Sequence, residues 1–222
     1  MKTLFTIFIF IVFTITVHSQ GSFLEIGQSA FSIGGGFSSN KDVTGFGGSV
    51  SYSVSGIFDF GVSIDHFSFK QQLLDEGSSA TVISPSIAFY ALKQNEDNPF
   101  SFAIGAGYEW QNYSNDVHDE YNIDMTGSFF SIGASLFGYY TQSIYMRIQP
   151  SISFTYVTGE IKVKDNNGNE ETEDDNATVF GFGLSLGFDI SPKNIFAITP
   201  RVSYSEGTSS FGLGLAFIFS TN

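Results

Sequence analysis

Residues 179–190 read VFGFGLSLGFDI, and in this stretch large apolar side chains alternate with glycine, serine and one aspartate. An alternation with a period of two indicates a β-strand, because successive side chains of a strand point to opposite faces. One face of this strand is strongly apolar, and the other carries almost no side chains. A half-buried strand of a soluble protein usually turns polar side chains to water on its second face. The second face of residues 179–190 has almost none, so this strand lies in different surroundings.

The same alternation recurs along the chain, and no segment shows a helical period. It is clearest in 46–54, 100–111 and 211–219, where Phe, Tyr, Val or Leu alternate with Gly, Ser or Ala. The pattern predicts an all-β protein of ten strands, at residues 28–37, 44–54, 57–69, 81–92, 100–112, 125–140, 144–157, 178–190, 195–205 and 210–219. Eight strands are the alternative, if the first two segments are irregular.

A transmembrane, antiparallel, up-and-down β-barrel explains both faces. Its outward face meets lipid and must be apolar, and closure pairs every backbone group where lipid offers no hydrogen bonds. Its inward face points into a confined lumen, where Gly and Ser fit. A soluble, lipocalin-like barrel is the alternative, but it needs large apolar groups inside and solubilising groups outside, and Gly and Ser make a poor solubilising exterior.

The composition of the chain excludes several classes of partner and site. The chain has 222 residues, no Cys, 14% charged residues and a formal net charge of −13. The negative charge argues against a nucleic-acid partner, and the lack of Cys rules out disulfides and argues against a thiolate metal site. No cofactor is expected.

The first residues, MKTLFTIFIFIVFTITVHSQ, have the organisation of a secretory signal peptide, with a basic Lys2 and an apolar run from Leu4 to Val17. We expect residues 1–19 to be the signal peptide, cleaved before Gln20, and residues 20–222 to form the outer-membrane barrel domain. An uncleaved anchor helix is the alternative, although about 20 apolar residues are needed to span a bilayer.

The links between strands differ in length and charge. Those at 55–56, 93–99, 141–143 and 191–194 are short, whereas 70–80, 113–124 and 158–177 are long and carry much of the negative charge. This sorting predicts short turns at one rim and long acidic loops at the other. Tyr and Trp near strand ends are expected to form interfacial girdles, at Tyr52, Tyr90, Tyr139, Tyr140, Tyr145, Tyr108, Trp110, Tyr156 and Tyr204.

These features together resemble the small outer-membrane β-barrel proteins of Gram-negative bacteria, the OmpA-like and porin-family barrels. The resemblance covers about residues 21–222 and rests on pattern rather than on a sharp motif. The closing FGLGLAFIF is similar to the terminal strand that the barrel-assembly machinery recognises in such proteins, although Ser220, Thr221 and Asn222 follow it here. The VHSQ region resembles exported proteins of the Bacteroidota. The resemblance implies a place in the cell outer membrane, beside its lipid and lipopolysaccharide.

A few ionisable residues share the inward parity and are candidate lumen charges: Asp59, Asp65, Glu109, Arg147, Asp189 and Arg201. Buried charges need partners, and we expect Arg147 to pair with Asp189, and Arg201 to meet Asp65 or Glu109 across the lumen. Such charges serve either a structural plug or a functional gate. Phe67, Phe129 and Phe137 are inward candidates that would block the lumen.

The acidic segment DNNGNEETEDDN, residues 165–176, has two interpretations. It could bind divalent cations weakly at the cell surface and bridge to lipopolysaccharide, but its spacing departs from that of an EF-hand. The simpler interpretation is a solvated loop that keeps the rim soluble.

The sequence gives little support to catalysis. His66 has the lipid-facing parity, and His118 lies among acidic residues in a link. No hydrolase or nucleotide-binding motif is present, so we expect no enzyme, no catalytic residue and no metal site. The predicted function is an integral outer-membrane barrel, with a narrow hydrated pore for small solutes as one hypothesis. A structural or adhesive barrel acting through its acidic extracellular loops is the alternative, and an outer-membrane hydrolase is a weaker one.

Overall fold

The computed structural model of the chain describes residues 20–70, 78–114, 124–143, 145–164 and 167–221. Ten long strands and one short strand, β7, follow a single turn of 3-10 helix, η2. Their bounds are η2 (Gln20–Phe23), β1 (Ala30–Ser39), β2 (Val43–Val54), β3 (Phe58–Phe69), β4 (Ser79–Leu92), β5 (Ser101–Ser114), β6 (Asp124–Phe137), β7 (Tyr140–Ser143), β8 (Met146–Lys164), β9 (Glu170–Ser191), β10 (Asn194–Ser205) and β11 (Thr208–Ser220).

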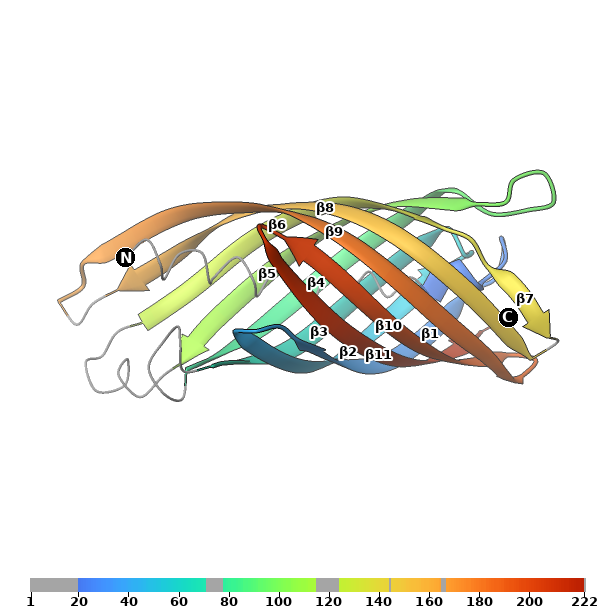
Figure 1. Cartoon of the computed structure of the whole chain (residues 1–222), viewed down its shortest axis with the longest axis horizontal. Coiled ribbons are helices and arrows are strands. Elements are labelled where there is room, and N and C mark those ends of the chain that lie inside the picture. Colours follow the sequence, from blue (N-terminus) through green and yellow to red (C-terminus); the bar gives the residue numbers. More distant parts are fainter. Residues whose placement is uncertain (1–19, 71–77, 115–123, 144, 165–166, 222) are drawn as a thin grey trace.

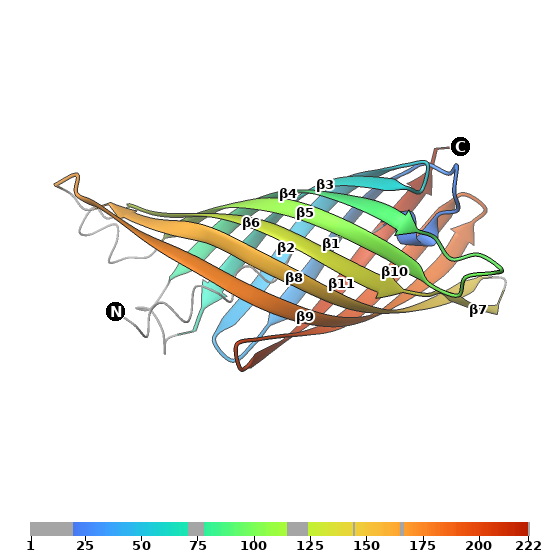
Figure 2. The ribbon, with the colours of Figure 1, turned by 90° about the horizontal axis from the view of Figure 1, so that it is seen from above.

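The strands form one closed antiparallel barrel (Figures 1 and 2). Strands that are neighbours in sequence pair with each other, except β6 and β7. In addition β1 pairs with β11, and the pairing of β6 with β8 completes the circle. The predicted ten-stranded up-and-down barrel is confirmed. The alternative of eight strands is wrong, because β1 and β2 pair without interruption over their whole common length.

A proline explains why β7 is separate from β6. The N–H of Gly138 donates to the carbonyl oxygen of Pro150 on β8, 3.3 Å away. Pro150 has no N–H to return, so the ladder is interrupted at this point. The chain then resumes as β7, which pairs with the first residues of β8.

In two tight turns, a glycine and the residue before it both have positive φ. Ser55 and Gly56 have φ of 54° and 63°, and Glu206 and Gly207 have φ of 45° and 84°. Positive φ at both central residues is the type I′ geometry. Glu206 and Gly207 form a two-residue hairpin loop between the paired Ser205 and Thr208, whereas the pairing of Val54 with Phe58 leaves three residues in the other loop. These turns join β2 to β3 at one end of the barrel and β10 to β11 at the other. We call the end that carries η2 and Ser220 the inner end, and the opposite end the outer end.

The outer wall of the barrel is apolar. Large side chains of the outward parity are exposed on every long strand, among them Phe46, Phe60, Ile64, Ile83, Trp110, Ile132, Ile152, Phe182, Val202 and Phe211. Water does not favour a continuous exterior of this kind, whereas lipid does. The predicted direction of the large side chains is confirmed, and the lipocalin-like alternative is wrong for the same reason.

Most of the described part of the link predicted at 158–177 is strand rather than loop. β8 continues to Lys164 and β9 begins at Glu170, and the two pair in unbroken register from Met146↔Phe188 to Lys164↔Glu170. Figures 1 and 2 show this hairpin reaching beyond the other strands at the outer end. The described part of the acidic segment, residues 167–176, is therefore mostly strand, and the interpretation as a solvated loop is wrong there. Backbone pairing with β8 holds these residues in place whatever their side chains prefer.

The aromatic girdles are largely as predicted, with Tyr52, Tyr140, Tyr156 and Tyr204 exposed on the wall. Tyr90 is the exception, because it is 3% exposed and points into the lumen. Tyr90 continues the alternation of β4, in which Val82, Ser84 and Ala88 also face inward, so its parity places it in the lumen although it lies near a strand end. The part of the chain that the structure describes contains no helix long and apolar enough to cross a membrane.

Candidate functional site

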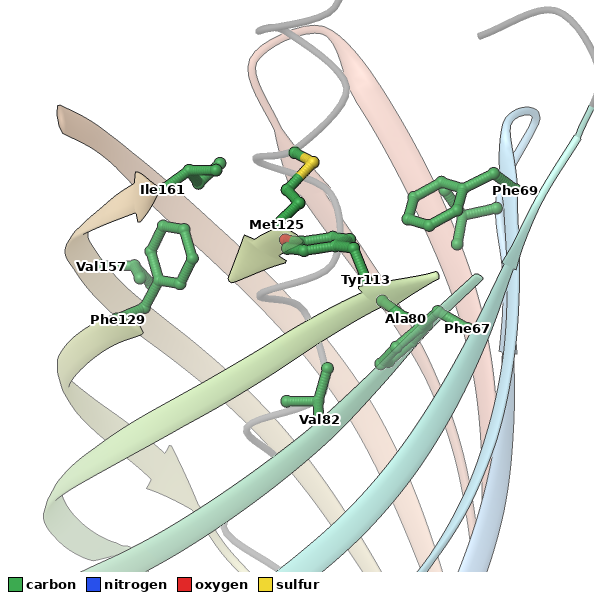
Figure 3. Packing of buried hydrophobic residues seen from close by; sticks show 10 residues of the cluster. Phe67, Phe69, Ala80, Val82, Tyr113, Met125, Phe129, Val157 and Ile161 are labelled. Carbon is green, nitrogen blue, oxygen red and sulfur yellow. The ribbon is translucent and has the colours of Figure 1, made fainter. Parts of the chain in front are cut away.

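An apolar collar lines the outer half of the lumen. Its inward-facing residues are buried and pack into one cluster (Figure 3), which comprises Val43, Phe67, Phe69, Ala80, Val82, Tyr113, Met125, Phe129, Val157 and Ile161. They come from β2, β3, β4, β5, β6 and β8, and each lies in the part of its strand toward the outer end. The predicted inward placement of Phe67 and Phe129 is confirmed. A collar of this composition differs from the polar interior of an aqueous barrel.

The N-terminal segment, residues 20–28, lies at the inner mouth. Phe23 and Leu24 are buried against side chains of β1, β10 and β11. Lys93 Nζ donates to the carbonyl oxygen of Leu24 at 2.8 Å, and Arg147 Nη1 donates to that of Phe23 at 2.9 Å. Two cations therefore hold the backbone of this segment, whose carbonyls would otherwise lack partners at the mouth.

A cavity of about 200 Å³ lies inside the barrel between these two features. Val179, which packs on the collar, and Phe23, from the N-terminal segment, both line it. The rest of its wall is mainly Gly, Ala and Ser, with Phe137, Gln149, Thr199 and Arg201 as the larger groups. The small inward side chains that the alternating sequence predicts are what leave this space open.

Arg147 and Asp189, the pair expected from neighbouring strands, form an ion pair. Arg147 Nη2 lies 3.2 Å from Asp189 Oδ1. Asp59, also near the inner end, is 3% exposed and accepts a hydrogen bond from the Tyr90 hydroxyl at 2.8 Å.

The other three predicted lumen charges lie deeper in the barrel. Asp65 accepts a hydrogen bond from Ser63 at 2.7 Å and is close enough to Arg201 for their charges to attract. Glu109 is fully buried, and its Oε2 accepts a hydrogen bond from Gln111 at 3.0 Å. No ion pair joins Arg201 to Asp65 or Glu109 within 4.0 Å among the described residues.

Two residues of the site were missed by the sequence analysis. Lys93 stands in a turn, where nothing in the sequence distinguishes it from an ordinary surface lysine. Gln149 has the inward parity, is 3% exposed and lines the cavity, and its Oε1 receives no hydrogen bond from the described residues. The inward parity of Gln149 could have indicated its place in the lumen, but only charged residues were named as lumen candidates.

Burial shifts the pKa of two groups outside the apolar band, Lys93 and Asp175. Burial lowers the pKa of Lys93 to about 8, and the nearby Asp59 carboxylate partly offsets this effect. Burial raises the pKa of Asp175, on the projecting hairpin, to about 6. The N–H of Asn176 donates to that carboxylate and opposes the shift, whereas the charges of Glu206 and Glu173 reinforce it.

His66 is the histidine that the described residues include. His66 lies on the outer wall beside Phe46, with 5.5 Å between ring centroids, and its Nδ1 is 3.4 Å from the Thr81 hydroxyl. His118 lies outside the described residues. Among those described, no three His, Cys, Asp or Glu side chains are placed to hold a metal ion.

Solved structures share this architecture. The translocator domain of the autotransporter NalP from Neisseria meningitidis has 10% identity and a TM-score of 0.52, over 88% of this chain and 89% of that one. The COG4313 outer membrane channel from Pseudomonas putida F1 has 12% identity and a TM-score of 0.50, over 89% and 96%. The chain has the fold of outer-membrane β-barrels. The attachment invasion locus protein Ail of Yersinia pestis is also similar, with 13% identity and a TM-score of 0.45, over 89% and 99%. No protein-family model and no curated protein matches the sequence.

Proposed function

We propose that the chain is an integral outer-membrane barrel that provides limited passage for small solutes. The observation that carries this proposal is the cavity of about 200 Å³ inside the closed barrel. It extends from the collar to the N-terminal segment, so a molecule that crosses the barrel has space between the two ends. The apolar outer wall supports the membrane placement, with the acidic hairpin of β8 and β9 at the cell surface.

The two ends would limit what passes. The collar narrows the outer half, and the N-terminal segment occupies the inner mouth, held by Lys93 and Arg147. Passage through such a barrel is expected to be slow and restricted to molecules that fit the cavity. Larger nutrients, such as oligosaccharides, exceed this space.

Uptake by intact cells tests the proposal. Cells that express the full chain would be offered a panel of small solutes from glycerol to phenol, and the rate of entry compared with that of cells carrying an empty vector. A Ser153→Trp variant is the matched control, because Ser153 lines the cavity and a large side chain there fills it. Faster entry of at least one solute, abolished by Ser153→Trp at equal barrel abundance, is the expected result. Equal rates for all solutes and all three strains would refute the proposal.

A second candidate function, contact with a partner at the cell surface, is favoured by the projecting hairpin. β9 pairs with β10 only from Phe180 inward, so residues 170–179 pair with β8 alone. The N–H of Asp189 donates to the carbonyl oxygen of Tyr145, just before β8. Because alternate residues of an antiparallel strand bond to the same neighbour, the N–H groups of the odd-numbered residues of β9 point toward β8. In residues 170–179 the N–H groups of the even-numbered residues therefore point to the unpaired edge. An exposed edge can accept a further strand, and the many carboxylates on β9 favour a basic one.

Proline substitutions test whether the unpaired edge of β9 makes this contact. Thr172→Pro removes an N–H that faces the free edge, whereas Glu173→Pro removes one that bonds to β8. A contact made through the edge predicts that Thr172→Pro abolishes binding of a lysine-rich extended peptide while the hairpin stays folded. Binding that survives Thr172→Pro would exclude the edge as the contact.

A further inference from the structure

We infer that the lumen takes small, uncharged, mainly apolar molecules that carry one hydrogen-bond donor, of which phenol is the simplest. This inference rests on the proposed function and names the class of solute. Three features of the lumen lead to it: the collar, the partners of its charges and Gln149.

The collar disfavours ions and strongly hydrated solutes. Phe67, Val82, Phe129, Val157 and Ile161 are each no more than 3% exposed and make this level of the lumen mainly apolar, with the buried Glu109 and Gln111 beside them. A hydrophobic constriction blocks ions by excluding water, because an ion that enters must lose its hydration. An apolar solute gains free energy on the same path, because it leaves water for hydrocarbon.

Most of the lumen charges are engaged with the protein rather than presented to a solute; Arg201 is the exception, because it lines the cavity, where the nearby Asp65 carboxylate partly offsets its charge. Asp59 bonds to Tyr90, Asp65 to Ser63, and Arg147 to Asp189. Glu109 is fully buried. These partners leave the cavity wall mostly neutral, as in apolar pockets that bind ligands through a few oriented polar groups.

Gln149 supplies such an oriented polar group. Its side chain reaches the cavity from β8, and its Oε1 is a buried acceptor without a donor among the described residues. A buried acceptor of this kind favours a ligand that brings a hydroxyl, because an unmade hydrogen bond is costly. The Ser and Thr hydroxyls around the cavity are weaker alternatives, because a hydroxyl can donate to other groups or accept from them.

The cavity volume sets the size of the molecule. A dry apolar cavity of about 150 Å³ holds benzene, so one of about 200 Å³ accepts a single substituted aromatic ring. A disaccharide does not fit, and a long acyl chain would have to extend into the collar.

Fluorine NMR of the full mature chain in detergent micelles tests the inference. The probes are 4-fluorophenol and fluorobenzene, whose signals distinguish ligand inside the barrel from ligand dissolved in the micelle. We expect saturable binding of both, with 4-fluorophenol tighter by about five- to tenfold, the effect of one net hydrogen bond. Gln149→Leu should remove this preference while fluorobenzene still binds, and Ser153→Trp should abolish binding of both.

The outcomes separate the inference from the proposed function. If 4-fluorophenol does not bind and polar solutes such as glycerol enter cells through the barrel, the apolar class is wrong and passage stands. If both probes bind with equal affinity, or Gln149→Leu leaves the preference unchanged, the role of Gln149 is wrong. If 4-fluorophenol binds but no solute enters cells, the lumen is a binding site and the proposed passage is wrong.

Discussion

Arg147, at the second position of β8, ties the wall of the barrel to its N-terminal segment. One nitrogen of its guanidinium lies 3.2 Å from Asp189 on β9, and another donates to the carbonyl oxygen of Phe23 at 2.9 Å. Phe23 also packs against Gly187, where a Cβ would lie 2.7 Å from its ring. The inner mouth is thus held by one charged anchor and by the absence of a side chain opposite the ring.

Removing the charged anchor should loosen the segment without unfolding the barrel. Arg147→Met keeps the aliphatic stem but loses the ion pair and the charged hydrogen bond to Phe23, a bond of a type that stabilises by about 1.5–3 kcal/mol. We expect proteolysis within residues 20–28 to become at least about tenfold faster. This factor corresponds to a decrease of roughly 1.4 kcal/mol in the free energy needed to open the segment. Mass spectrometry of the cleavage products measures this rate.

Lys162→Met is the control for Arg147→Met, because its exposed ion pair with Glu160 lies on the projecting hairpin. Its proteolysis at residues 20–28 should match that of the unmodified chain. Equal proteolysis of all three proteins would show that Arg147 does not hold the segment.

Lys93 gives the stability a dependence on pH. Its pKa is lowered to about 8 in the folded protein from a usual value of 10.5, mainly by burial. Between these two values the unfolded chain binds more protons than the folded one, so stability rises as pH increases from about 8 to 10.5. Denaturant unfolding across this range should show the rise.

Lys93→Met isolates this contribution from that of the tyrosines, which titrate in the same range. The difference in unfolding free energy between the original chain and Lys93→Met should shift in favour of the original chain as pH rises. A difference that is constant from pH 7 to 10.5 would contradict the shifted titration of Lys93.

Gly159 allows β8 to pass close to β6. A Cβ at this position would lie 2.2 Å from the carbonyl oxygen of Ser128 and 2.5 Å from the ring of Phe129. Because backbone cannot move aside cheaply, Gly159→Ala should destabilise the barrel by about 1–3 kcal/mol, the usual effect of overpacking. Gly48→Ala is the matched control, since its new methyl group would approach no atom closer than 3.7 Å. Equal unfolding midpoints in denaturant for both variants would refute the close contact.

The sequence predicted the barrel wall well, because lipid and lumen impose a strict alternation on every strand. Composition misled at residues 158–177, where acidic side chains suggested a loop, although backbone pairing with β8 extends the strand. The collar was only partly predicted. Phe67 and Phe129 were expected to face inward as separate residues, but Val82 and Val157, which face inward beside them and complete the cluster, were not identified. The attachment of residues 20–28 depends on contacts of Lys93 and Arg147 with distant backbone, which no local pattern encodes.

Tyr90 provides a test of the polar interior near the inner end. Its hydroxyl donates to Asp59 Oδ2 at 2.8 Å, and both side chains are 3% exposed. Tyr90→Phe removes the donor and leaves the buried carboxylate with one hydrogen bond fewer, so the unfolding free energy should fall by about 1–3 kcal/mol. Tyr52→Phe, on the exposed outer wall, should change it by less than about 0.5 kcal/mol. In an Asp59→Asn background the effect of Tyr90→Phe should shrink, since a neutral acceptor makes a weaker bond; an undiminished effect would mean that Tyr90 stabilises the barrel through its packing on Phe137 instead.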